Sequence, residues 1–218
     1  MKVIYVLILA IILLISCEKE DDTPSTESPK EPIPYTYTPM KIGNYWIYQH
    51  YKVDTNDIET ELTKRDSICV VGDTIINNKT YNILERIRIS NINPSKYYSY
   101  YRDSTGYLIN DRGTILFSET NFTDTLQLMT EVYEEDTFYI VTCVMENYNN
   151  SISLPSGTFN NILNFKGTLW IGANPNNVKN PRYLNNYYSK NIGLIYRNYY
   201  YLNKHDRFEE RLIAYHIN

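Results

Sequence analysis

Short apolar and aromatic segments separated by turn residues are the feature that most restricts how this chain can fold. Residues 137–146 are the clearest case, because Phe138, Ile140 and Val144 share one side of an extended strand and further apolar residues occupy the other. An Asn-rich turn at residues 77–79 tolerates positive φ and joins two such segments as a hairpin. No segment repeats apolar residues at helical spacing. The pattern predicts an antiparallel sheet.

The fold class that we expect is all-β, and composition agrees with it. Tyr is abundant, at 23 residues, and aromatic residues suit half-buried pleated surfaces. About eight to eleven short strands would make a curved antiparallel sheet that forms a half-barrel, barrel or sandwich, with few or no helices. Residues 119–133 fit no single state, and residues 174–186 indicate a polar loop. The candidate segments for these strands are residues 45–53, 67–76, 80–89, 96–102, 107–110, 114–118, 137–146, 151–154, 162–171, 187–189, 193–202 and 209–217.

Residues 1–16 have the pattern of a lipoprotein signal peptide. Lys2 supplies a positive start, and the apolar run at residues 3–15 is shorter than the about 20 residues that a helix needs to cross hydrocarbon. The sequence Leu14-Ile15-Ser16-Cys17 resembles the lipobox of bacterial lipoproteins. That resemblance implies that Cys17 becomes the acylated N-terminus. Two or three acyl chains would hold the protein lastingly at a membrane.

Residues 17–39 have the composition of a tether that precedes a single β-rich domain at residues 40–218. Pro, Ser, Thr and acidic residues dominate the segment, which therefore cannot bury enough apolar surface to order itself. Its first residues resemble the acidic export signal that places lipoproteins of Bacteroidetes on the cell surface: Lys19, Glu20, Asp21 and Asp22. The alternative is a simple solvated charge run, which would leave the domain at the periplasmic face of the outer membrane.

Three segments of the domain together resemble a group of uncharacterised Bacteroidetes lipoproteins. They are Pro-Met-Lys-Ile-Gly-Asn-Tyr-Trp-Ile-Tyr at residues 39–48, Leu-Pro-Ser-Gly-Thr-Phe at residues 154–159 and Tyr-Tyr-Ser-Lys-Asn-Ile-Gly-Leu-Ile at residues 187–195. The resemblance implies that these segments are structural, and it brings no catalytic residues. More remotely, it implies the curved sheet of lipoprotein-carrier and lipocalin-like proteins.

Charge and motif content argue against several functional classes. The formal net charge of −4 comes mostly from the acidic tether, so the domain is nearly neutral and has no basic surface for nucleic acid. The three histidines, His50, His205 and His216, do not stand at the spacing of metal ligands. Motifs for a serine nucleophile, a phosphate loop or a dinucleotide are missing. We therefore expect no metal, no cofactor and no enzymatic activity.

Two tyrosine runs are the candidate ligand face. Consecutive residues of a strand face both sides, so some of these rings would be exposed and could stack on a sugar or anchor a protein. The alternative is that tyrosine serves here only as a good strand residue. The candidates are Tyr98, Tyr100, Tyr199, Tyr200 and Tyr201.

Covalent features of the domain leave alternatives open. Cys69 and Cys143 stand in strand-like segments and could form a disulfide after export, or remain buried as separate thiols. Four short Asp-Ser/Thr motifs resemble the O-glycosylation sequence of exported Bacteroidetes proteins. The residues that would carry a glycan are Ser67, Thr74, Ser104 and Thr125.

We expect a membrane-anchored, non-enzymatic binding or accessory lipoprotein whose β domain meets a lipid, a glycan or a protein. A deep apolar hollow would favour a carrier, and a flat aromatic face would favour an interaction module. The alternative is a hydrolase of envelope or dietary glycans with paired carboxylates. Residues 134–136 and Glu209-Glu210 supply the candidate acids, which would have to converge in one cleft.

We predict that Cys17→Ala abolishes incorporation of radioactive fatty acid in growing cells, because the acylated thiol is lost. Cys69→Ala is the matched control and should be labelled as strongly as the wild type. Equal labelling of the Cys17→Ala protein would refute the lipoprotein interpretation.

Overall fold

The computed structural model describes residues 36–90, 94–133, 136–172 and 181–218, which form antiparallel β structure throughout. These residues contain no helix, and none could therefore cross a membrane as a helix. The predicted fold class is confirmed. The strands are β1 (Tyr45–Val53), β2 (Glu59–Ile76), β3 (Lys79–Ile89), β4 (Ser95–Ser104), β5 (Tyr107–Asn110), β6 (Ile115–Ser118), β7 (Gln127–Tyr133), β8 (Asp136–Tyr148), β9 (Ile152–Leu154), β10 (Gly157–Phe159), β11 (Ile162–Ile171), β12 (Arg182–Leu184), β13 (Asn186–Ser189), β14 (Gly193–Tyr200) and β15 (Arg207–His216).

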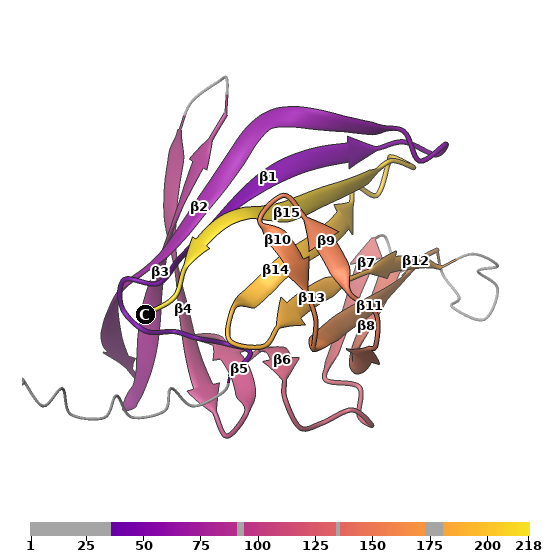
Figure 1. Cartoon of the computed structure of the whole chain (residues 1–218). Helices are drawn as coiled ribbons and strands as arrows, with labels where there is room; N and C mark the ends of the chain where they lie inside the picture. The colour runs from indigo at the N-terminus through magenta and orange to yellow at the C-terminus, as the bar shows by residue number, and fades with distance from the viewer. Residues whose placement is uncertain (1–35, 91–93, 134–135, 173–180) are drawn as a thin grey trace, which may run out of the picture. The chain divides into compact units, whose positions relative to one another are not determined.

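Twelve strands form one continuous curled sheet in the order β6-β5-β4-β3-β2-β1-β15-β14-β13-β11-β8-β7 (Figure 1). β12 pairs with β11 outside this path, and β9 and β10 form a separate hairpin. The two end strands approach one another, because Gln127 Nε2 of β7 lies 3.5 Å from Ile115 O of β6. No ladder of backbone hydrogen bonds joins β6 to β7 within the described ranges. The barrel-like wall is therefore nearly closed, with one seam between these two strands.

The β2–β3 hairpin shows how local sequence sets the sheet. Asn77 and Asn78 have φ values of 49° and 60°, which is the geometry that the Asn-rich turn predicts. β2 starts at Glu59, well before the predicted residue 67. The prediction missed its first half because these residues are mostly polar and show no apolar alternation. Pairing with β1 extends it, beginning with Val53 opposite Glu59.

The three segments that carry the family resemblance meet in one buried cluster. Trp46 and Phe159 belong to its core, and Leu154 and Ile192 pack against it. The indole Nε1 of Trp46 donates a hydrogen bond to Ile192 O at 2.6 Å. Gly193 has a φ of 96° and lies against the same indole ring. These residues join the first strand to the β9–β10 hairpin and to the turn between β13 and β14, which is a structural role.

β8 is not the central strand that the sequence predicts, because only β7 follows it at the end of the sheet. One of its faces is buried, with Val141, Cys143 and Met145 in the core. Phe138 belongs to the other face and is 45% exposed. The prediction that Phe138 is a core residue is therefore wrong. The sheet curls around its inner face only, so apolar residues on both sides of a strand do not prove burial on both.

The predicted tether is too long by several residues at its C-terminal end. Glu119 Oε1 accepts hydrogen bonds from Thr36 Oγ1 at 3.1 Å and from Tyr37 N at 2.8 Å. Thr38 is buried. Residues 36–39 thus belong to the domain, since side chains distant in sequence supply the partners that the segment lacks locally.

We predict that Met145→Ala lowers the free energy of unfolding by about 2–5 kcal/mol, because it leaves a cavity in the core. Phe138→Ala on the same strand should cost at most about 1 kcal/mol, as expected for an exposed side chain. Urea denaturation of both variants measures the difference. A larger loss for Phe138→Ala than for Met145→Ala would contradict the assigned faces of β8.

Candidate functional site

The curled sheet surrounds a cavity with a volume of about 300 Å³, at the lower end of the range for small-molecule sites. Its wall is mostly apolar and includes Trp46, Leu84, Leu108 and Phe165. Residues 37–40 also line it, so the segment that leads into β1 forms part of the wall. The domain therefore has the apolar hollow that a carrier needs.

Two arginines are the charged residues among the described residues that line the cavity: Arg86 of β3 and Arg197 of β14. The side chain of Arg197 is 31% accessible even though it pairs with a buried carboxylate. Arg197 also contacts the hollow, because it is one of the lining residues. The wall thus combines apolar side chains with positive charge.

The two arginines belong to a buried charge network on five adjacent strands. Asp66 Oδ2 accepts from Arg86 Nη1 at 3.0 Å, and its two oxygens accept from Arg88 Nε and Nη2 at 2.9 and 3.1 Å. Glu210 accepts two hydrogen bonds from Arg197, at 2.7 and 2.6 Å. We use "charge network" for the six residues His50 (β1), Asp66 (β2), Arg86 and Arg88 (β3), Arg197 (β14) and Glu210 (β15).

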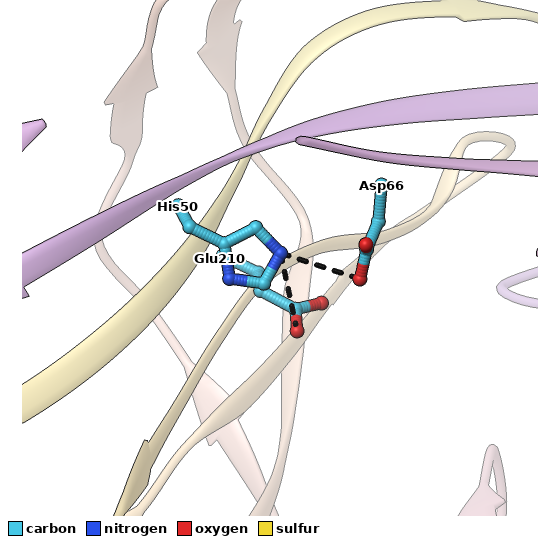
Figure 2. A group of neighbouring side chains, drawn as sticks. All are labelled: His50, Asp66 and Glu210. Atoms are coloured by element: carbon cyan, nitrogen blue, oxygen red, sulfur yellow. Dashed lines mark ion pairs between the residues drawn. The ribbon is translucent and has the colours of Figure 1, made fainter. Parts of the chain in front are cut away.

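His50 lies at the centre of the charge network and is fully buried. Figure 2 shows that one ring nitrogen faces both carboxylates: Nε2 lies 3.2 Å from Asp66 Oδ2 and 3.7 Å from Glu210 Oε1. Neither ring nitrogen makes a hydrogen bond of good geometry to any other described residue. The ring is therefore held by packing and by its contacts with the two carboxylates.

His50, Asp66 and Glu210 could each offer a metal ligand atom, and these atoms lie within 4.8 Å of one another. However, all four carboxylate oxygens already accept hydrogen bonds from guanidinium groups. A divalent cation would have to displace these groups and would then lie beside three positive charges. The geometry favours a charge network over a metal centre.

The network holds both carboxylates in their charged form. Burial alone would raise the pKa of Asp66, but contact with His50, hydrogen bonds from Arg88 and the charge of Arg86 outweigh it and keep the pKa well below its usual range. Burial likewise opposes the charge of Glu210, and the charge and hydrogen bonds of Arg197 lower its pKa. Neither carboxyl is protonated near neutral pH.

The predicted tyrosine face is not a single surface, because four strands lie between β4 and β14 in the sheet. Tyr98 of β4 is 49% exposed and donates a hydrogen bond to Glu85 Oε2 at 3.1 Å. Tyr199 instead stacks on Phe208, with ring centroids 5.7 Å apart. The remaining candidates divide in the same way: Tyr100 lies on β4, whereas Tyr200 and the neighbouring exposed Tyr201 follow Tyr199.

Cys69 and Cys143 are free thiols on β2 and β8, so the structure does not contain the disulfide considered from the sequence. Cys143 lines the cavity, and burial raises the pKa of its thiol to about 11. Cys69 lies near Glu85, whose partners Lys96 and Tyr98 are on the outside of the sheet. The two thiols therefore occupy different environments.

The other predicted site residues are dispersed. Thr125 is exposed in the loop before β7, and the other three candidate glycosylation sites are half-buried: Ser67, Thr74 and Ser104. Several predicted residues lie outside the described residues: Cys17, Lys19, Glu20, Asp21, Asp22, Glu134 and Glu135.

Glu209 and Glu210 do not form a catalytic pair. Glu210 bonds to Arg197, whereas Glu209 bonds to Arg207 and Arg211 at 2.7 Å each. Neighbouring residues of a strand point to opposite faces, so these carboxylates lie on different sides of the sheet. The pair that does converge, Asp66 with Glu210, was not predicted.

The sequence did contain a signal for Asp66. It is in phase with Ile68 and Val70, both buried, and a charged residue on a buried face requires partners. Arg86 stands in phase with Leu84 in the same way. No comparable signal identifies which strands bring the partners together.

No family profile matches the sequence, and no curated protein matches it significantly. Two crystal structures align with most of the chain. One is described as a candidate lipoprotein of Parabacteroides distasonis, with 13% identity, a TM-score of 0.47, and coverage of 85% of this chain and 100% of that one. The other is described as a candidate exported protein with a YmcC-like fold from Bacteroides fragilis, with 11% identity, a TM-score of 0.47, and coverage of 84% and 99%.

We predict that stability is retained down to about pH 5 and falls progressively below about pH 4. Asp66 and Glu210 have lowered pKa values in the folded protein, so the unfolded chain takes up protons first as the pH falls. Urea denaturation across this range measures the slope. Asp66→Asn should flatten it, while Asp111→Asn, at an exposed turn, should leave it unchanged. An unchanged slope in Asp66→Asn would contradict the prediction.

Proposed function

We propose that this protein is an anchored binding protein that holds a small apolar molecule, such as a single acyl chain, inside the cavity. The observation that supports the proposal is the mostly apolar wall of a hollow with the volume of a small ligand site. A filled core would have been the stable default, since a void forfeits dispersion contacts along its lining. The hollow is thus a feature that binding would explain.

Acylation of Cys17 and the acidic residues behind it would complete this function. Both are proposals from the sequence, and together they would hold the domain at the outer membrane, where acyl chains are abundant. In this proposal the protein is an accessory lipoprotein, with its ligand drawn from the envelope. Display at the cell surface is the orientation that residues 19–22 favour.

The geometry gives less support to a glycan hydrolase. Such an enzyme needs a carboxyl that is protonated near neutral pH to act as a general acid. Asp66 and Glu210 converge, but both have lowered pKa values and both are bonded to arginine on every oxygen. This pair is therefore unsuited to that chemistry.

We predict that the neutral fluorescent probe N-phenyl-1-naphthylamine binds the purified domain at one site and that dodecan-1-ol displaces it. Ser99 of β4 lines the cavity, so Ser99→Phe should fill part of the hollow and weaken binding by about tenfold or more. Fluorescence titration measures both effects.

Tyr98→Phe is the matched control, because Tyr98 is the neighbouring residue on the same strand and is exposed. It should bind the probe as the wild type does. Circular dichroism confirms that each variant is folded. Failure of the wild type to bind, or equal weakening by both substitutions, would refute the proposal.

A further inference from the structure

The inner wall of the sheet changes from apolar to charged in the same direction on neighbouring strands. On each of three strands, an apolar residue of the inner face is followed, two positions along the strand, by a charged residue of the same face. Because adjacent strands are antiparallel, rising numbers on β3 and falling numbers on β2 and β15 run the same way. The pairs are Leu84 and Arg86 on β3, Ile68 and Asp66 on β2, and Leu212 and Glu210 on β15.

From this polarity we infer that the cavity binds a single-chain amphiphile whose anionic headgroup, a carboxylate or a phosphate, contacts Arg86 and Arg197. This inference rests on the proposed function and specifies the class of ligand. An acyl chain would occupy the part of the cavity lined by Trp46, Leu84 and Phe165. Its headgroup would meet the two arginines of the wall.

Both arginines have donors to spare for an anion. A guanidinium carries five N–H groups, and Arg86 donates one hydrogen bond to described residues, from Nη1 to Asp66. Arg197 donates from Nε and Nη2 to Glu210, which leaves Nη1. The planar fork of these groups suits a carboxylate or a phosphate. No acidic residue lines the cavity within the described ranges, so the anion would meet no carboxylate directly, and Asp66 and Glu210 lie behind the guanidinium groups.

The charge balance of the network favours the same ligand. Each of the three arginines pairs with a carboxylate, but three guanidinium charges face only two carboxylates, so the network has a net positive charge even if His50 is neutral. Lys64 of β2 also faces the network, and its pKa is lowered by burial and by the charge of Arg88. An excess cation in a partly buried site is costly, and an anion from the ligand would offset it. An anionic headgroup would thus neutralise the excess positive charge of the network.

Isothermal titration of the wild-type domain with four probes of equal chain length tests this inference. Dodecanoate and dodecyl phosphate should each bind about tenfold more tightly than dodecan-1-ol, as expected for one added charge-assisted contact. The tighter of the two anions identifies the headgroup. Dodecyltrimethylammonium, with a cationic headgroup, should bind more weakly than the alcohol.

Arg86→Gln should lower the affinity for both anions by about tenfold and leave the affinity for dodecan-1-ol unchanged. Arg86 also lies 3.5 Å from Glu210, but in this variant Asp66 keeps its two hydrogen bonds from Arg88 and Glu210 keeps its two from Arg197, so neither carboxylate is left unpaired. Arg88→Gln is the matched control: it removes the same charge beside the same carboxylate, but Arg88 does not line the cavity. Its affinity for the anions should remain close to that of the wild type.

The outcomes separate the two proposals. If dodecan-1-ol or the cationic probe binds the wild type as tightly as the anions, the headgroup inference is overturned and the apolar cavity site stands. Equal weakening by Arg86→Gln and Arg88→Gln also overturns it. If none of the probes binds, both proposals fail. The comparison of probes on the wild type needs no variant, so it decides the matter even if Arg86→Gln does not fold.

Discussion

The pairing of buried charges inside the curled sheet is the constraint on which this structure depends. Asp66, Glu210, His50 and the arginines around them lie on five consecutive strands, and an unpaired charge in this position would be severely destabilising. A slip of one residue in any of these strands would turn its charge to the outer face and leave its partner buried alone. The network therefore fixes the register of the strands that surround the cavity.

Much of the architecture could be predicted because short stretches of the sequence determine it. Turn residues such as Asn77-Asn78 and the alternation of residues 137–146 mark strands without knowledge of their neighbours. Which face of a strand is covered cannot be predicted in this way. Phe138 and Val141 look equally apolar in the sequence, and only the curl of the sheet decides that Val141 is covered while Phe138 meets solvent.

The candidate site could be predicted far less, because it is a property of strands brought together. The pattern of β2 marks Asp66 as a charge among buried residues, but nothing near it in sequence indicates that Arg88 and His50 lie beside it. The tyrosine runs predicted one ligand face, yet they lie on separate parts of the sheet. A hollow is harder still to predict, because it consists of volume that no side chain fills.

The position of residues 36–40 has a mechanical consequence. The chain enters the domain along the wall of the cavity, which Tyr37 and Met40 line. Glu119 accepts hydrogen bonds from Thr36 and Tyr37. Tension applied to the chain before Thr36 therefore falls first on these hydrogen bonds and then on the lining itself. A ligand in the cavity would support that lining. The affinity for the ligand and the force needed to unfold the domain from its N-terminal side are therefore linked.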